Sequence, residues 1–146
     1  MAIRQPTCQN CGAGLSTGLG GVGSSVWVAE RDIVPASLKT LGCRVEGIDG
    51  SQEAMRDSVI PTCHVLRDYV DGVFRPEESF DLVWSCEFVE HVEQNYLDHF
   101  FETFSVAKKY VMMTYARPGQ PGWHPVNWQP EGYWVEKLNG IGYEVE

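Results

Sequence analysis

Residues 80–92, FDLVWSCEFVEHV, set the narrowest limits on the fold. A charged turn precedes a short apolar run, and such a run fits a strand that is buried on both faces of a parallel sheet. Ser85, Cys86 and Glu87 follow where this strand ends, and a helix that opens with a carboxylate and His91 is expected next. Because open α/β sheets bind ligands beyond the carboxyl ends of their strands, the run predicts a site at this point.

Short apolar segments alternate with helical patterns along the rest of the chain. This alternation predicts an α/β fold that is Rossmann-like, with a mostly parallel sheet and helices on both faces. The last strand begins where the chain ends, so the sheet is expected to be incomplete at the C-terminus, with an exposed edge. The expected strands cover 26–29, 44–49, 63–68, 80–85, 110–115 and 143–146, and the expected helices cover 35–41, 52–56, 95–107 and 131–138.

Length and composition fit one domain with a real core. The chain has 146 residues, of which 43% are hydrophobic, and residues 26–146 are expected to form that domain. The Gly-rich stretch 1–25 is expected to be a flexible tail or a glycine loop. No apolar run approaches the roughly 20 residues that span a bilayer, and the N-terminus lacks the apolar core of a secretory signal, so no membrane partner is expected.

The charge of the chain limits the class of ligand, and its cysteines bear on the cellular location and on metal binding. The net charge of −9 disfavours binding to a phosphate backbone and favours a small or neutral substrate, or a cationic ligand, over nucleic acid. Five cysteines without a signal segment predict reduced thiols and a cytoplasmic location. Cys8 and Cys11 have the spacing of half a zinc site, but no second Cys-x-x-Cys exists. Free thiols are therefore favoured over a site completed by other ligands, and no metal is predicted.

Acidic residues end two further expected strands. Asp49, followed by Gly50, stands where a carboxylate can accept hydrogen bonds from both ribose hydroxyls of a nucleoside cofactor. The structural alternative is a turn aspartate. Asp68, followed by Tyr69, could bind an adenine amine, or could be a loop carboxylate in water. With residues 85–87 at a third strand end, these residues predict one cofactor site along a single edge of the sheet.

The motifs resemble those of class I S-adenosylmethionine-dependent methyltransferases over residues 38–145. The most specific piece is FDLVWSCEFVEHV, which is similar to the fourth-strand motif of that family. The last part of the chain resembles a small subgroup of viral and metagenomic type, in which a His-Val-Asn run follows a Pro-Gly-Gln-x-Gly run. The other similar segments are LGCRVEGIDGS for the second strand, HVLRDYV for the third, and the stretch from KKYVMMTY onward for the fifth strand and its loop.

This resemblance implies S-adenosylmethionine as the cofactor and methyl transfer as the reaction. It places Asp49 on the ribose and Asp68 on the adenine side. Glu30 and the 85–87 strand end would face the methionine part. Such a reaction needs mainly alignment and desolvation, which binding geometry can supply.

Two histidines are candidate bases for the acceptor proton. His91 follows the fourth-strand motif, and its structural alternative is to cap or pack the helix. His124 lies beside Trp123, Asn127 and Trp128 on a loop that is expected to be irregular, where aromatic residues could wall an acceptor pocket or merely pack. Pro125 stands where the subgroup has its histidine, one place after His124.

The chain departs from the family at the glycine loop. Where a Gly-x-Gly turn should bring the backbone to the cofactor, it reads Ala29-Glu30-Arg31-Asp32. Three explanations stay open: a remodelled loop that still binds, a degenerate relative that has lost cofactor binding and acts as a non-catalytic binding or interaction module, or an N-terminal segment that is not the native one. An NAD-type Rossmann enzyme is disfavoured by the same lack of glycines. The sequence leaves the methyl acceptor and the oligomeric state open.

Overall fold

A mixed α/β fold is seen in the computed structural model, which describes residues 2–4, 25–29, 33–58, 61–120 and 126–145. Seven strands of this part form one sheet. The α/β prediction is therefore confirmed at this level. The strands are β1 (Ala2–Arg4), β2 (Ser25–Ala29), β3 (Arg44–Asp49), β4 (His64–Leu66), β5 (Phe80–Ser85), β6 (Ala107–Met113) and β7 (Glu144–Val145).

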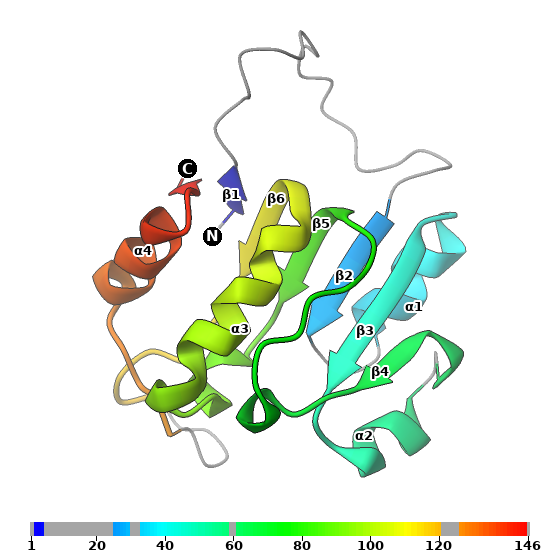
Figure 1. Ribbon diagram of the computed structural model, residues 1–146, viewed down its shortest axis with the longest axis horizontal. Coiled ribbons are helices and arrows are strands. Elements are labelled where there is room, and N and C mark those ends of the chain that lie inside the picture. The colour runs from blue at the N-terminus through cyan, green and yellow to red at the C-terminus, as the bar shows by residue number, and fades with distance from the viewer. Residues whose placement is uncertain (1, 5–24, 30–32, 59–60, 121–125, 146) are drawn as a thin grey trace, which may run out of the picture.

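The strands β4, β3, β2, β5 and β6 lie side by side in that order and run parallel, as predicted. In the register, Ala29 pairs with Ser85 and Asp49 pairs with Leu66. The carboxyl ends of these strands therefore meet at one edge of the sheet, which is the lower edge in Figure 1.

The far side of the sheet was not predicted. β1 inserts antiparallel between β6 and β7, with Ile3 opposite both Val111 and Val145. Residues 2–4 are therefore a strand rather than part of a tail or glycine loop, and 5–24 lie outside the described residues. Among the described strands, β7 is the outermost on this side of the sheet and β4 on the other.

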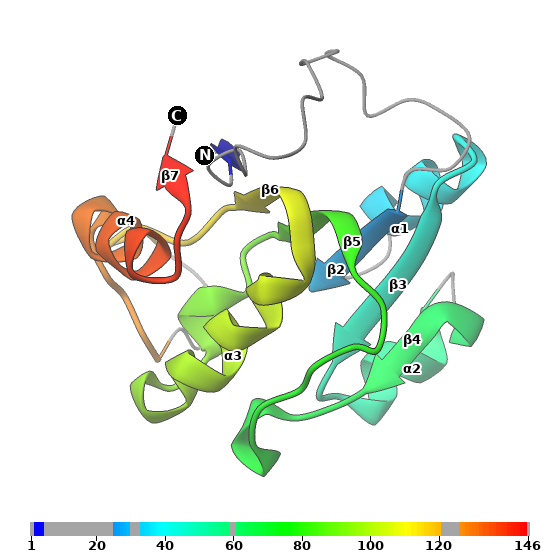
Figure 2. The ribbon, with the colours of Figure 1, turned by 45° about the horizontal axis from the view of Figure 1, so that its top comes forward.

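Helices lie on the two faces of the sheet. In Figures 1 and 2, α3 crosses the face turned to the viewer and α1 lies behind β2 and β3. The α-helices are α1 (Ile33–Thr40), α2 (Gln52–Asp57), α3 (Leu97–Thr103) and α4 (Glu131–Gly140), and the 3-10 turns are η1 (Pro61–Cys63), η2 (Tyr69–Asp71), η3 (Val89–His91), η4 (Gln94–Tyr96) and η5 (Phe104–Val106).

The helix expected after β5 is wrong, because only the single turn η3 forms there. Glu87 has φ +47, a left-handed conformation, and Val92 is extended, so neither side of the turn can continue a helix. The helix expected over 95–107 is shorter than predicted: η4 and η5 flank α3, and Ala107 already belongs to β6.

Most of the core lies between the sheet and the helices α3 and α4. Most of the apolar stripe predicted over 95–107 is buried there, including Phe100 of α3 and Phe104 of η5, whose rings lie 4.8 Å apart. Trp134 of α4 and Tyr143 fill the same cluster. A smaller cluster on the other face joins Cys43, Val45 and Leu82, with Leu38 of α1 packed against it.

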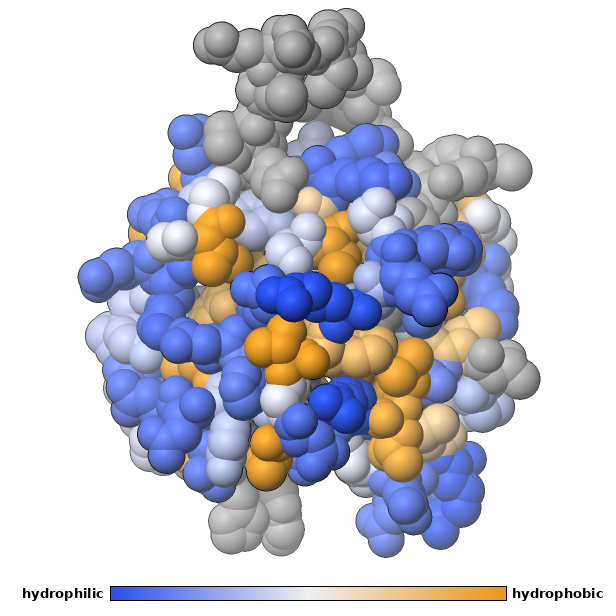
Figure 3. Space-filling view, viewed as in Figure 1, coloured by the Kyte–Doolittle hydropathy of each residue, from blue (hydrophilic) through white to orange (hydrophobic). Residues whose placement is uncertain are grey.

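The surface is mixed. On the face seen in Figure 3, small groups of hydrophobic residues lie between hydrophilic ones. Among the described helices, none has the length and apolar character needed to cross a membrane. Within the part of the chain whose burial is described, the exposed large hydrophobic side chains are Leu41, Leu66, Val70, Val73, Val126, Trp128 and Ile141.

Candidate functional site

Asp49 and Asp68 lie at neighbouring strand ends. The Asp49 Oδ1 atom accepts a hydrogen bond from the Ser51 amide at 2.7 Å, and the Ser51 hydroxyl in turn caps α2. The Asp68 Oδ1 atom accepts from the Val70 amide at 3.0 Å and so caps η2. Each aspartate therefore uses one oxygen to hold its own turn, which is the structural role weighed for Asp49, and each has a second oxygen on the same carboxylate.

Gly50 brings these two strand ends together. A Cβ atom at Gly50 would lie 3.5 Å from the Asp68 Cα atom. The Arg67 amide donates to the Asp49 carbonyl at 2.9 Å, which extends the pairing of β3 and β4 beyond their last ladder residues. The predicted neighbourhood of Asp49, Gly50 and Asp68 is therefore present.

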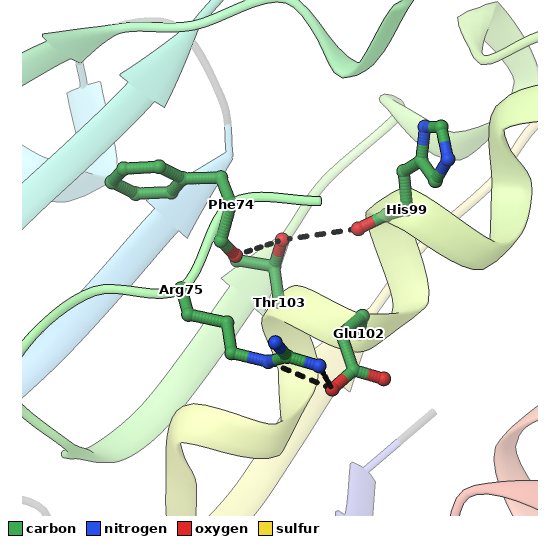
Figure 4. A network of polar contacts seen from close by, with 5 residues as sticks. All are labelled: Phe74, Arg75, His99, Glu102 and Thr103. Carbon is green, nitrogen blue, oxygen red and sulfur yellow. Dashed lines mark hydrogen bonds and ion pairs between the residues drawn. The ribbon is translucent and has the colours of Figure 1, made fainter. Parts of the chain in front are cut away.

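The turn at Tyr69 is fixed from the opposite side by α3. The His99 side chain contacts the Tyr69 carbonyl through Nδ1 at 2.7 Å, a bond in which the Nδ1–H tautomer donates. Figure 4 shows how the following loop is tied to the same helix: Arg75 pairs with Glu102 at 2.6 Å, and the Thr103 hydroxyl contacts the Phe74 carbonyl at 3.3 Å. These contacts hold the chain between β4 and β5 against the helix face.

A pocket of about 270 Å³ lies beside this turn. That volume is near the lower limit of typical small-molecule sites. Of the predicted site residues, the pocket brings together Gly50, Asp68, Tyr69 and His91, and its further lining residues are Arg67, Val70, Phe88, Val92, Glu93 and Tyr96.

Aromatic rings build one wall of the pocket. The Phe88 ring stacks on Phe100 of α3 at 5.6 Å and meets the edge of Tyr69 at 6.2 Å. Burial raises the pKa of Tyr69 above its ordinary value, so this phenol stays neutral in the physiological range. Phe88 and Tyr96 were not predicted as site residues, although Phe88 lies in the most specific motif and Tyr96 lies in the η4 turn just after it.

The β5 end forms a second, separate group. Thr114, which follows β6, joins its parts: its amide donates to the Ser85 carbonyl at 2.9 Å, and its hydroxyl accepts from the Glu87 amide and contacts Cys86 Sγ at 3.3 Å. Neither Asp49 nor the three residues of this strand end line the pocket. The prediction of one shared hollow is therefore met only in part.

Glu87 is the only non-glycine residue in the described part of the chain with a positive φ. Such a conformation costs on the order of 1–3 kcal/mol and persists only where the surroundings enforce it. Here the Glu87 amide donates a hydrogen bond of 3.0 Å to the Thr114 hydroxyl, and this bond holds the backbone in place. The Glu87 side chain is exposed beyond the strand end.

The structure adds Glu90, to which the sequence analysis gave no role. Its side chain is only 2% exposed. The Oε1 atom accepts from the Ala116 amide at 3.1 Å, and the backbone carbonyl accepts from the amides of Val126 and Asn127 at 2.9 and 3.0 Å. Its apolar neighbours in FVEHV are the sequence signal that could have predicted its burial.

Asn127 is the second buried polar residue near this turn. Its side-chain amide donates to the Val92 carbonyl at 3.2 Å and its oxygen accepts from Gln129. Asn127 therefore packs the loop, as the structural alternative expected, while Trp128 is exposed and does not line the pocket. Glu30, His124 and Trp123 lie outside the described residues, where the predictions on them stay untested.

No family model matches this chain, and no curated protein matches it either. The features on which a function can be argued are thus those of the molecule itself: a mixed α/β sheet, carboxylates at the ends of two adjacent parallel strands, and an aromatic-walled pocket. Among the described residues, no group of three or more His, Cys, Asp or Glu is placed to hold a metal ion.

Proposed function

We propose that this protein binds S-adenosylmethionine along the carboxyl edge of a Rossmann-like sheet and transfers the methyl group to a small-molecule acceptor. The observation that carries the proposal is the meeting of Asp49, Gly50 and Asp68 beside a pocket that is walled by Tyr69 and Phe88. Two carboxylates next to an aromatic wall match the hydroxyls, amine and flat ring of a nucleoside.

Each carboxylate keeps one oxygen for the ligand in this proposal. Oδ1 of Asp49 and Oδ1 of Asp68 are used by backbone amides, and each Oδ2 atom accepts no hydrogen bond within the described part of the chain. Asp49 would bind the ribose and Asp68 the adenine amine. The 85–87 strand end, with Glu30, would face the methionine part.

Bound S-adenosylmethionine would supply an electrophilic methyl group, whose transfer breaks one carbon–sulfur bond, leaves a thioether and releases a proton from the acceptor. His91 is exposed and lines the pocket, so its imidazole can reach an acceptor there and take that proton. The wall formed by Phe88 and Tyr69 would exclude water from the nucleoside side. Alignment and water exclusion are the main contributions that such a displacement needs.

A second candidate function is binding without catalysis. The chain has no glycine in the stretch Glu30-Arg31-Asp32 that joins β2 to α1, where a nucleotide site usually brings backbone close to its ligand. A module that binds the nucleoside end alone would need only the β3 and β4 strand ends and the pocket.

Isothermal titration calorimetry with S-adenosylmethionine and S-adenosylhomocysteine tests the proposal. Asp49→Asn removes a charged acceptor that is worth about 1.5–3 kcal/mol, so binding should weaken roughly 10- to 150-fold. Asp98→Asn, an exposed aspartate on α3 that pairs with Lys137, is the matched control and should bind like the parent.

The outcomes separate the candidates. Absence of heat from protein whose folding is shown by circular dichroism would overturn both functions. Binding that Asp49→Asn leaves unchanged would overturn the site. Binding without transfer of a labelled methyl group to any acceptor in a metabolite mixture would favour the binding module.

A further inference from the structure

The turn η3 has two sides that face different parts of the molecule. On one side, Phe88, His91 and Val92 line the pocket. On the other side, Glu90 holds two segments that are distant in sequence, one just after β6 and one just before α4. His91 is adjacent to Glu90 in the chain, and Phe88 and Val92 are two residues away. A change in the position of Glu90 is therefore transmitted to the pocket wall through the backbone.

Glu90 makes three of the four hydrogen bonds that join the turn to these segments in the described part of the chain. Its side chain accepts from Ala116 and its carbonyl from Val126 and Asn127, while the carbonyl of Val92 accepts the fourth from the Asn127 side chain. Loss of the Glu90 position would free both segments at once.

The Glu90 carboxyl group is poorly solvated for an ion. Its Oε2 atom is buried and has no hydrogen-bond partner among the residues that the structure describes. A buried carboxylate normally needs several donors or a positive partner, and here its donors in the described part are backbone amides alone, that of Ala116 at Oε1 and that of Glu90 itself. The neutral acid is therefore the form that this place accommodates.

The charged groups around Glu90 do not change this conclusion. Burial has the largest effect and raises the pKa of Glu90. The hydrogen bonds from the amides of Glu90 and Ala116 lower the pKa by less, and the charges of Glu87 and His91 have the smallest effects, Glu87 raising it and His91 lowering it. In the segment that contains Ala116, the next residue, Arg117, is exposed. The preceding residue, Tyr115, has a pKa that burial raises.

We propose that Glu90 is a proton-dependent clamp, whose neutral carboxyl group holds the segments at Ala116 and at Val126–Asn127 against η3 and whose ionisation releases them. The released turn carries His91 and Phe88 with it, so the pocket wall loosens as well. The clamp is a property of the free protein and holds whether or not the pocket takes the cofactor proposed above.

The sign of the pH effect follows from the direction of the pKa shift. The closed state has the raised pKa, so it binds more protons than the open state between the two pKa values. The ratio of closed to open protein is highest below the ordinary carboxyl pKa. It falls as the pH rises from there to the raised pKa of Glu90. The ratio of closed to open falls about tenfold for each pH unit that separates the two pKa values.

Amide hydrogen exchange measured by NMR from about pH 5 to about pH 9 tests the clamp, with protection factors corrected for the intrinsic exchange rate. We expect protection of the Ala116, Val126 and Asn127 amides to fall as the pH rises, while the core amide of Val111 keeps its protection. Glu90→Gln, which is neutral at every pH, should hold these three amides closed throughout. Glu136→Gln, which changes an exposed glutamate of α4 that does not line the pocket, should keep the pH dependence of the parent.

Two results would overturn the clamp. One is wild-type protection that does not change over the pH range, which needs no variant and so cannot be blamed on misfolding. The other is a pH dependence in Glu90→Gln equal to that of the parent. Glu90→Ala, which lacks the acceptor, should leave the Ala116 amide open at every pH, and a protected Ala116 amide in it would also contradict the proposal.

Discussion

Replacing Gly47 by alanine should test how closely β3 packs against the His64 side chain of β4. Gly47 lies directly opposite His64 in the ladder between these strands. A Cβ atom built on Gly47 would overlap the Cδ2 and Nε2 atoms of the His64 ring and lie 3.3 Å from its Cγ atom. The imidazole therefore occupies the place of a side chain on the neighbouring strand, and only glycine leaves that place open.

Two opposing terms set the magnitude. Forcing a methyl group against the ring costs about 1–3 kcal/mol, and the lower half of that range is expected because His64 is half-buried and its ring can move outward. Alanine is preferred over glycine in a strand by about 0.5–1 kcal/mol. The free energy of unfolding of Gly47→Ala should therefore drop by up to about 1.5 kcal/mol.

A double-mutant cycle measured by urea unfolding isolates the contact. In a His64→Ala background the clash is gone, so Gly47→Ala should stabilise the protein by about 0.5–1 kcal/mol. Gly132→Ala is the matched control: it lies in α4 with open space around the new Cβ, and it should stabilise by up to about 1 kcal/mol. If the effects at 47 and 64 add to within about 0.5 kcal/mol, the ring does not explain the glycine and the reasoning fails.

Two further predictions concern buried tyrosines. The Tyr143 hydroxyl is buried and donates to the Phe104 carbonyl at 2.5 Å, so Tyr143→Phe should lower the free energy of unfolding by about 1–2 kcal/mol in urea, and an unchanged midpoint would show that this bond adds nothing. Because burial raises the pKa of Tyr69 above 10, the stability that its neutral phenol provides should be lost as the pH rises above about 10. Thermal unfolding between about pH 9 and pH 11 should show a steeper loss for the parent than for Tyr69→Phe, and equal slopes would contradict the assignment.

The strands that were predicted at their correct bounds are flanked by residues that favour turns. Residues 44–49 stand between Gly42 and Gly50, and residues 80–85 stand between a charged turn and Glu87. Local signals of this kind fix where a strand begins and ends without reference to its partners. The cap at Ser51 was predictable for the same reason, because the serine precedes the helix that it starts.

The elements that escaped prediction depend on distant partners. β1 has three residues, too few for an alternating pattern, and its neighbours β6 and β7 lie at the other end of the chain. Most hydrogen-bond donors to Glu90 are the amides of distant residues, among them Ala116 and Asn127. The sequence around Glu90 does not indicate which residues these donors are. Sequence patterns of short period cannot contain such information.

The break after β5 connects these features to the site. A regular helix from Glu87 onward would place Phe88, His91 and Val92 on one face and keep the carbonyl of Glu90 for its own helix bonds. The left-handed residue Glu87 before the turn and the extended residue Val92 after it prevent that helix, so the Glu90 carbonyl is available to the segment before α4 while His91 stays exposed beside the pocket. The strain at Glu87 is thus the local cost of a turn that serves two neighbours, the pocket on one side and the clamp on the other.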